Sequence, residues 1–267
     1  MSEPSESLFW QAKVWGLLHD PAFKALHNNA GRGGNSFWQE LAAMQTWNNS
    51  GWNPEADKQP GLLKHIHLAD YITSASDRGA IGSLPASINY GADGLEVSHL
   101  LSGDKLPLVL QPEIHAKLMQ SGRTDFLSNL EQRLLPETIR AERDIRKVFW
   151  WLWRCLPTAA CQAFKDDRLL LMPAETRLPD SSLWNHASLT AAFSGALAGE
   201  ATAVEIHSGT ARKSHPYLAS FTFTPVQELI KASRKMRDFW AGSWILHYLS
   251  ARVSWKLAQI YGPDSLI

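Results

Sequence analysis

The chain has 267 residues, of which 45% are hydrophobic, so it is long enough to form one large domain or two small ones around a substantial core. Its 26 Lys and Arg residues balance 26 Asp and Glu residues, so the overall charge does not indicate a nucleic-acid-binding protein, and any such contact must come from a local patch. The two cysteines form no CxxC pair, which argues against a thiolate metal site and favours a reducing compartment. Because the sequence has neither a signal-peptide pattern nor an apolar stretch long enough to span a bilayer, we expect a cytoplasmic protein without membrane contact.

The first predicted helix runs from Ser7 to Asp20 and carries His19 at the end of its apolar face. The residues that share this face lie at helical spacing: Leu8, Ala12, Trp15 and His19. Pro21 follows directly, so an imidazole and a carboxylate meet at an abrupt helix end. Burying the carboxylate is costly unless a positive group meets it, and a metal ion would satisfy both side chains. The alternative is an ordinary helix end at which Asp20 binds nearby backbone groups.

A second informative helix is predicted from Leu62 to about Ser76. Its polar residues at three- and four-residue spacing share one face: His67, Asp70, Ser74 and Asp77. Asp70 lies in an otherwise buriable stretch, so a metal ligand and a solvated polar residue both remain open for it. For Asp77, near the helix end, the solvated face is the favoured interpretation.

Turn-forming residues divide the stretch 83–110 into short segments, which predicts a small hairpin. Helices are expected to follow at about 112–120, 126–134 and 137–156. The last of them carries basic residues between Arg140 and Lys147, beside the aromatic run from Val148 to Trp153. Such a pattern can bind a nucleic-acid strand, but an amphipathic helix that packs its tryptophans inward is the favoured interpretation.

A further helix is predicted after Asp180 or Ser181, either of which is a good N-cap. One stripe of this helix combines apolar and polar residues: Leu183, His186, Thr190 and Leu197. His186 is therefore expected to point toward the core. Considered alone, it would be an ordinary core histidine held by a hydrogen bond.

The last part of the chain changes character at about residue 216. Residues 218–223 alternate as a strand does, and Thr224–Gln227 combines a capping box with proline at the first helical position. A basic helix through Lys231–Arg237 and an amphipathic helix at 244–261 are expected next. One strand and two helices are too little for an independent domain, so we expect this part to be the beginning of a larger structure.

Together, His19, Asp20, Asp70 and His186 form a set in which each residue lies near the apolar side of a predicted helix. HD-superfamily phosphohydrolases hold a metal with His, His-Asp and Asp in that chain order, whereas the order here is a circular permutation of it. The permuted order resembles the large subunit of type III CRISPR effector complexes, in the Cmr (type III-B) branch of the Cas-ten superfamily. Four blocks carry the resemblance: Leu17–Pro21 with Lys24; Ala69–Asp70 with Ser74–Arg78; Thr176–Arg177 with Pro179–His186; and Pro225–Glu228 with Ala232–Ser243.

The resemblance implies a mainly α fold. Residues 1–215 would form a circularly permuted HD-domain helical fold with metal-dependent nuclease activity. Residues 216–267 would form the incomplete start of an α/β ferredoxin-like palm domain. The family's second palm carries a Gly-Gly-Asp-Asp motif for cyclic oligoadenylate synthesis, and this chain has no such motif, so no cyclase activity is assigned to it.

The same resemblance implies a site made of metal ligands and catalytic residues. The metal ligands would be His19, Asp20, Asp70 and His186, and the catalytic residues His19, Asp20 and Lys24. Lys24 would steady the phosphate, although a solvated surface lysine fits its position equally well. Candidates for a second metal ion, or for support behind the first, are His65, His67 and Asp77. The expected cofactor is a divalent ion, for which manganese, nickel, cobalt, iron and magnesium all suit nitrogen–oxygen ligation.

The implied function is cleavage of single-stranded DNA in antiviral defence, when the effector complex has bound target RNA. The implied partners are the other Cmr subunits with their guide RNA, target RNA indirectly, and the single-stranded DNA substrate. Two alternatives remain open at this point: an HD phosphohydrolase of small nucleotides, and a structural effector subunit with an unused metal site.

Overall fold

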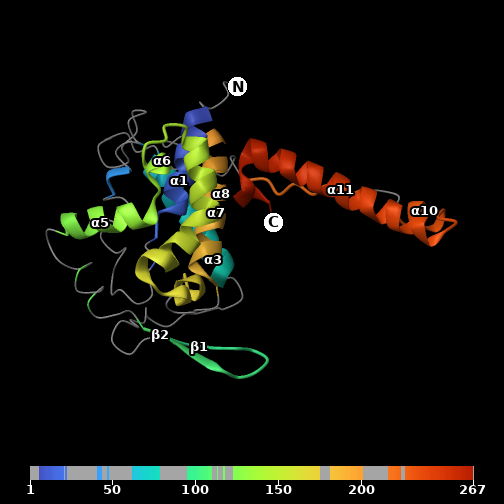
Figure 1. Cartoon of the computed structure of the whole chain (residues 1–267). Helices are drawn as coiled ribbons and strands as arrows, with labels where there is room; N and C mark the ends of the chain where they lie inside the picture. Colours follow the sequence, from blue (N-terminus) through green and yellow to red (C-terminus); the bar gives the residue numbers. More distant parts are fainter. Residues whose placement is uncertain are drawn as a thin grey trace. The chain divides into compact units, whose positions relative to one another are not determined.

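The computed structural model describes residues 6–20, 22, 41–43, 47, 62–78, 95–109, 113, 117, 123–174, 181–200, 216–223 and 226–266. These residues form mostly helices together with one two-stranded sheet, so the predicted mainly α class is confirmed (Figure 1). The chain divides into two compact units, residues 1–214 and 215–267, which are described in turn. Among the described residues, no helix combines the length and the hydropathy needed to cross a bilayer.

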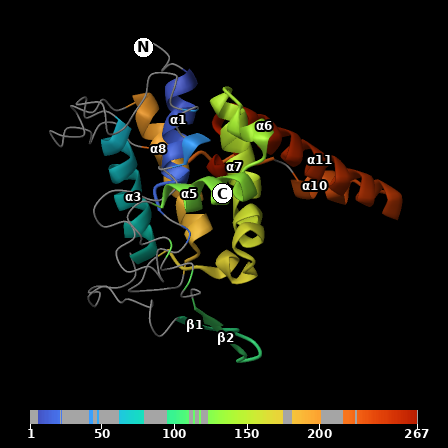
Figure 2. The same ribbon diagram turned by 60° about the vertical axis from the view of Figure 1, so that its left-hand side comes forward.

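Three helices form the centre of the first unit: α1 (Glu6–Leu17), α8 (Leu183–Glu200) and α3 (Leu62–Arg78). Helix α8 packs against both α1 and α3, and Figures 1 and 2 show α1 and α8 side by side. Helix α1 is buried on nearly all sides, with Trp10 and Val14 in the core. Its polar residues Gln11 and Lys13 are buried as well, so neighbours cover more than one face of this helix. The first helix is therefore a central element that other helices surround.

Helices α1 and α8 approach closely because small residues face each other where they meet. A Cβ atom on Gly16 would lie 2.6 Å from Oγ of Ser194 and 2.9 Å from Cα of Ala191. A Cβ atom on Gly195 would lie 2.7 Å from Cγ of Lys13. Neither glycine can carry a side chain without moving its neighbours, so these two positions set the spacing of the helix pair.

The predicted single helix at 137–156 is wrong, because the chain breaks into α6 (Glu137–Arg140) and α7 (Ile145–Phe164). The break has a physical cause at Asp144, whose carboxylate accepts hydrogen bonds from the backbone N–H groups of Arg146 and Lys147. This arrangement is an N-cap, which starts a new helix and satisfies donors that the helix itself leaves without partners.

Helix α7 packs its aromatic residues inward, which confirms the favoured interpretation of the amphipathic pattern. Phe149 is fully buried, and the indole N–H of Trp153 donates to Oγ of Ser188 on α8 at 2.9 Å. The guanidinium of Arg146 lies 5.5 Å from the centre of the Trp10 ring on α1. One of the basic residues is thus part of the packing between helices.

Helix α5 (Thr124–Leu134) covers another side of the core with Leu127 and Leu130. Its buried Glu131 accepts hydrogen bonds from the backbone N–H groups of Ala42 and Ala43, at 3.0 and 2.6 Å. These bonds satisfy the buried carboxylate, as a buried charge requires.

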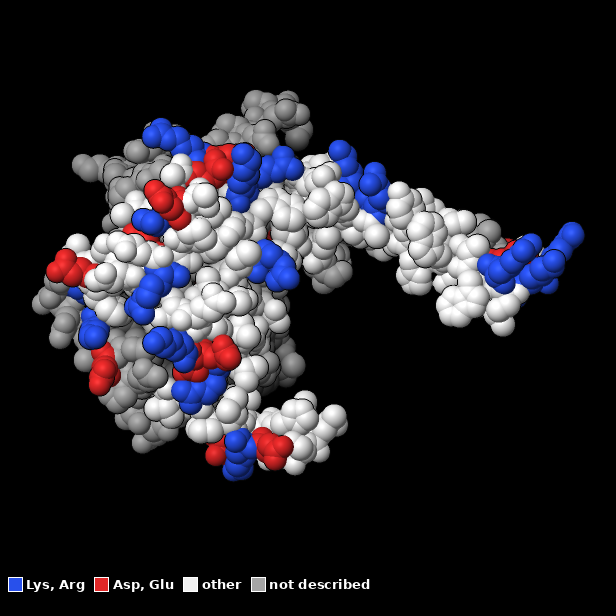
Figure 3. Space-filling view, viewed as in Figure 1, with Lys and Arg blue, Asp and Glu red and all other residues white. Residues whose placement is uncertain are grey.

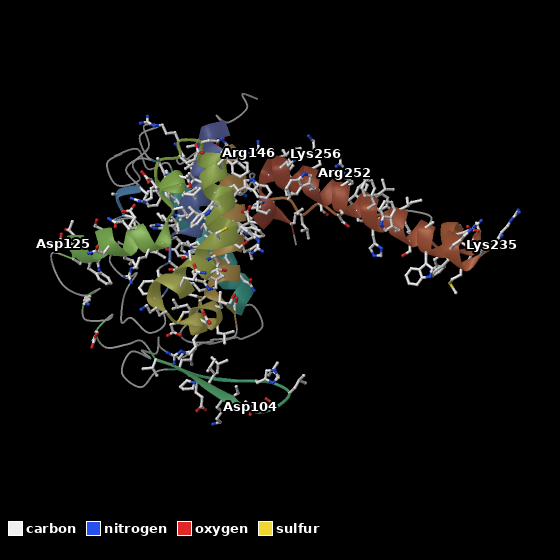
Figure 4. All side chains as sticks on the ribbon, viewed as in Figure 1. Asp104, Asp125, Arg146, Lys235, Arg252 and Lys256 are labelled. Carbon is white, nitrogen blue, oxygen red and sulfur yellow. The ribbon has the colours of Figure 1, made fainter. Side chains whose placement is uncertain are left out.

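The predicted hairpin is confirmed by strands β1 (Leu95–Ser98) and β2 (Lys105–Leu108), which pair antiparallel with Leu95 opposite Leu108. Both of these leucines are buried and join the core of the first unit. The far end of the hairpin is exposed, and Asp104 marks it in Figure 4. The hairpin is therefore anchored at its base.

A second anchor of the hairpin is Arg168, in the 3₁₀ helix η2 (Asp167–Leu171). Its guanidinium donates to the carbonyl of Pro107 at 3.1 Å and to both carboxylate oxygens of Asp166, at 2.7 and 2.8 Å. A fork of this kind fixes the guanidinium, so β2 is fixed to the turn after α7.

The second unit contains helices α10 (Val226–Lys231) and α11 (Met236–Tyr261) and the 3₁₀ turn η4 (Pro263–Ser265). The predicted strand at 218–223 is wrong for the described part of the chain, where this segment pairs with no other strand. The predicted helix start at Trp244 is also wrong, since α11 begins eight residues earlier. Most of α11 is exposed, including many large apolar residues: Phe239, Trp240, Trp244, Ile245, Tyr248, Leu249 and Trp255.

Candidate metal centre

Three side chains from two distant parts of the sequence meet beside α1 and α8. Nε2 of His19 lies 3.2 Å from Nε2 of His186 and 3.3 Å from Oδ2 of Asp20. Nε2 of His186 lies 3.7 Å from the same carboxylate oxygen. Ligand atoms of the three residues all lie within 4.8 Å of one another.

Asp70 joins this group from helix α3. Its Oδ1 lies 3.2 Å from Nε2 of His186 and 3.6 Å from Nε2 of His19. The structure thus brings together all four residues that the sequence proposes as ligands. His19, Asp20 and His186 form the compact part, and Asp70 adds a second carboxylate that contacts both histidines.

The end of α1 determines the orientation of the His19 side chain. The helix ends at Leu17, three residues earlier than predicted, so His19 and Asp20 lie in the turn that follows it. Nδ1 of His19 donates to the carbonyl of Gly16 at 2.6 Å. With Nδ1 engaged in this way, the other ring nitrogen, Nε2, faces His186 and the carboxylates. A carbonyl partner of this kind commonly orients metal-binding histidines.

The other two ligands are placed by the starts and turns of their helices. His186 lies in the first turn of α8, where Oγ of Ser182 accepts from the backbone N–H of Asn185 at 3.2 Å. On α3, Oγ of Ser74 donates to Oδ1 of Asp70 at 3.2 Å, one helical turn away. The candidate ligands His186 and Asp70 therefore each lie beside a hydrogen bond formed within their own helix.

The site is buried on one side and open on the other. His186 and Asp20 are buried, whereas the side chain of Asp70 is 30% exposed. Asp70 is therefore the most exposed of the four side chains.

The carboxylates change the protonation of His19. Burial by itself lowers the pKa of this imidazole, but the charges and hydrogen bonds of Asp20 and Asp70 outweigh burial and raise its pKa to about 10. The imidazole of His19 is therefore protonated at neutral pH, and a metal ion that binds to it would have to displace that proton.

The arrangement fits a divalent ion. Two neighbouring ligands of an ion bound at about 2.1 Å are separated by roughly 3.0–3.4 Å, close to the distances between the four side chains. Two imidazole nitrogens with two carboxylates suit manganese, nickel, cobalt, iron or magnesium, so the donor set fits a metal without selecting one.

The remaining predicted site residues are Lys24, His65, His67 and Asp77. Lys24 lies outside the described residues. His65 and His67 both lie on α3, where His65 is buried and His67 is exposed. The backbone of Asp77 lies in the last turns of α3, and its side chain is outside the described part. The roles proposed for these four residues stay predictions.

Sequence reasoning missed the supporting role of Gly16. Its carbonyl orients His19, and its lack of a side chain lets α1 approach α8. The available signal was a glycine within an otherwise bulky apolar helix, three residues before a histidine.

Comparisons with known proteins found one matching family and one relative. Residues 218–267 match the family described as CRISPR-associated protein Cmr2, N-terminal. The CRISPR system Cmr subunit Cmr2 of Pyrococcus furiosus is 31% identical over 96 residues. This chain is related to the Cmr2 large subunits of type III-B CRISPR systems. The aligned region covers 36% of this chain and 9% of that Cmr2. No solved structure matches the chain significantly.

The family match to Cmr2 lies wholly within the second unit of the chain, at 215–267. The four candidate ligands lie in the first unit. The match to the Cmr2 of Pyrococcus furiosus, at 96 residues, is longer than the second unit and so is not confined to it.

Proposed function

We propose that the first unit is the metal-dependent nuclease part of a type III CRISPR effector large subunit. The observation that carries this proposal is the convergence of His19 and Asp20 with Asp70 and His186, at distances of 3.2–3.7 Å. The chain order of these residues is the permuted HD order that the sequence analysis describes, and the relationship to Cmr2 supports the same assignment.

The chemistry assigned to this site is hydrolysis of a phosphodiester bond in single-stranded DNA. A bound divalent ion would lower the pKa of its water and neutralise charge on the scissile phosphate. His19 and His186 supply the nitrogen ligands, and Asp20 and Asp70 supply the negative charge that retains a cation. The exposed edge of Asp70 leaves a side on which the phosphate can bind. Lys24 is the candidate to steady that phosphate.

The second unit, 215–267, is assigned to the start of a ferredoxin-like palm domain. Its support is the family match at 218–267 and the large apolar side chains that α11 exposes. Such a surface is typical of a helix that packs against further protein. The partners proposed for the whole subunit are the other Cmr subunits, the guide RNA and, through it, target RNA.

The test compares Asp20→Ala and His186→Ala with wild type, in the presence of Cmr partners, guide RNA and target RNA. Metal content is measured together with cleavage of single-stranded DNA and of deoxynucleoside triphosphates. Both variants are expected to lose bound metal and to reduce DNA cleavage to background. The matched control is Asp125→Ala, an exposed aspartate on α5 that Figure 4 labels, which should behave as wild type.

Each other outcome assigns a different function. Cleavage of triphosphates but not of DNA would favour a small-nucleotide phosphohydrolase. Stoichiometric metal with no hydrolysis of either substrate would favour a structural subunit. DNA cleavage at the wild-type rate by either variant would show that the ligand assignment is wrong.

A further inference from the structure

Two buried threonines connect α3 and α8 one helical turn from the candidate metal centre. Oγ1 of Thr190 donates to Oγ1 of Thr73 at 3.2 Å, and Oγ1 of Thr73 donates in turn to the carbonyl of Ala69 at 2.9 Å. Both threonines are fully buried. The result is a short relay of hydrogen bonds from one helix to the backbone of the other.

The positions of the two threonines relate them to two ligands. Thr73 follows Asp70 by three residues on α3, and Thr190 follows His186 by four residues on α8. Residues at these spacings lie on the same side of a helix, one turn apart. The hydroxyl pair therefore joins the two helices on the faces that present Asp70 and His186 to each other.

The pair is also costly to disturb. A hydroxyl buried away from water loses free energy unless it keeps a hydrogen-bond partner, and each threonine provides the other with one. If α3 slid or moved away from α8, this bond would break with no water to replace it. The bond thus favours one spacing of the two helices, and with it one distance between Asp70 and His186.

We propose that Thr73 and Thr190 are positioning residues for the metal centre, which hold Asp70 within binding distance of the ion that His186 binds. This inference rests on the proposed function, because it assumes that the cluster binds a divalent ion. It adds that the fourth ligand depends on a hydrogen bond between helices that touches neither the ion nor the substrate.

The experiment uses the full chain with Co²⁺ as the probe, because the visible absorption of Co²⁺ reports its coordination geometry. Thr190→Val removes the donor while keeping a β-branched side chain of similar size. It should weaken Co²⁺ binding by about tenfold, the loss typical of groups that orient metal ligands, and change the absorption spectrum. Thr190→Ser restores the hydroxyl and should return both affinity and spectrum close to those of wild type.

The control is Ser188→Ala, which removes a hydrogen bond from the same helix on the side that faces α7, where Trp153 is the donor. It should lower the melting temperature, as Thr190→Val does, but leave the Co²⁺ affinity and spectrum unchanged. Thr73→Val should reproduce the effect of Thr190→Val, and the double valine variant should add little to either one.

The outcomes separate this inference from the proposed function. Wild-type affinity and spectrum in Thr190→Val would overturn the positioning role while leaving the metal centre intact. Equal metal losses in Ser188→Ala and Thr190→Val would also overturn it, because the effect would then be general destabilisation. Failure of the wild-type chain to bind Co²⁺ would overturn the proposed function, and the positioning role with it.

Discussion

Nε2 of His19 lies 3.2 Å from Nε2 of His186, although 167 positions separate the two residues in the sequence. Two imidazole nitrogens at this distance repel each other through their lone pairs unless a proton or a metal ion lies between them. Carboxylate oxygens of Asp20 and Asp70 surround the same point. A shared proton or a bound metal ion would satisfy both imidazole nitrogens at this point.

The first prediction is that metal binding releases a proton. The pKa of His19 is raised to about 10, so its imidazole is protonated at pH 7, and a metal ion requires the neutral ring. Apparent affinity should therefore rise by about tenfold per pH unit between pH 7 and pH 9, while one proton is displaced per ion. Calorimetric titration with Mn²⁺ in two buffers of different ionisation enthalpy measures that proton. A binding enthalpy that is independent of the buffer would contradict the prediction.

The second prediction concerns the close crossing of α1 and α8. In Gly16→Ala the new Cβ atom would meet Cα of Ala191 at 2.9 Å, and backbone cannot rotate away as a side chain can. The helices must separate, which should lower the free energy of unfolding by about 1–3 kcal/mol. Because α1 and α8 lead to His19 and His186, metal affinity should fall as well.

A matched control for this substitution is Gly242→Ala in α11. Apart from its chain neighbours and the backbone of its own helix, no atom of the described residues lies within 4 Å of the position that its Cβ would take. Alanine is a better helix former than glycine, so this variant should be neutral or more stable by up to about 1 kcal/mol. Urea unfolding and Mn²⁺ titration of both variants provide the comparison. A Gly16→Ala protein as stable as Gly242→Ala would show that the crossing is looser than the structure indicates.

The third prediction concerns the ion pair that anchors the hairpin. The side-chain hydrogen bonds from Arg168 lower the pKa of Asp166 below its ordinary value of 3.8. A carboxyl group with a lowered folded-state pKa stabilises the protein above the unfolded-state pKa, and this contribution is lost as the pH falls through the folded-state value. Since the pair is partly exposed, Asp166→Asn should cost only about 1 kcal/mol at pH 6.

Thermal unfolding at pH 6 and pH 3 provides the measurement. The difference between wild type and Asp166→Asn should shrink at pH 3, because the contribution of the ionised carboxyl group declines once the pH falls below the unfolded-state pKa, toward the lowered folded-state pKa. An equal difference at both pH values would mean that the asparagine disturbs packing and that the charge contributes nothing.

The sequence selected four residues that lie together in the structure, whereas several of the elements that carry them were predicted with wrong bounds, and their role as metal ligands stays a prediction. His19, Asp20, Asp70 and His186 could be selected because polar residues on apolar helix faces are few, and because their chain order resembles a known family. Their distances could not be predicted, since these depend on how closely α1 and α8 pack at Gly16. That packing is a property of two helices far apart in the sequence.

The errors in the predicted elements have local and non-local causes. The break before α7 was missed because Asp144 lies in a stretch with charges of both signs, where it does not stand out as an N-cap. The strand at 218–223 was predicted from correct alternation, but a strand also needs a neighbour, and the described residues provide none. The hairpin was predicted correctly because its turn residues and alternation are close together in the sequence.

The fourth prediction is that the chain alone binds single-stranded DNA weakly. Its formal net charge is zero, and part of its local positive charge is already engaged. On α7, Nζ of Lys147 lies 3.7–3.8 Å from carboxylate oxygens of Asp144 and Glu142, and Arg146 stacks on Trp10. Figure 3 shows both signs of charge interspersed over the first unit.

The second unit carries a basic group with fewer acidic neighbours. The group consists of four exposed residues: Lys231, Arg234, Lys235 and Arg237. Figure 4 labels Lys235. This group lies in the region that matches Cmr2, next to the exposed apolar side chains of α11 for which packing against further protein is proposed. We therefore expect it to add little to the affinity of the chain for DNA by itself.

Titration of a labelled single strand at 50 and 200 mM salt, with and without the Cmr partners, tests this expectation. Because phosphate contacts release counterions, what binding the chain shows should fall steeply with salt, by about tenfold or more over this range for a few contacts. The partners, with guide and target RNA in place, should strengthen binding. A double substitution, Arg234→Ala with Lys235→Ala, should leave binding by the isolated chain nearly unchanged. Tight binding by the chain alone that resists salt would contradict this prediction and indicate a self-sufficient DNA-binding enzyme.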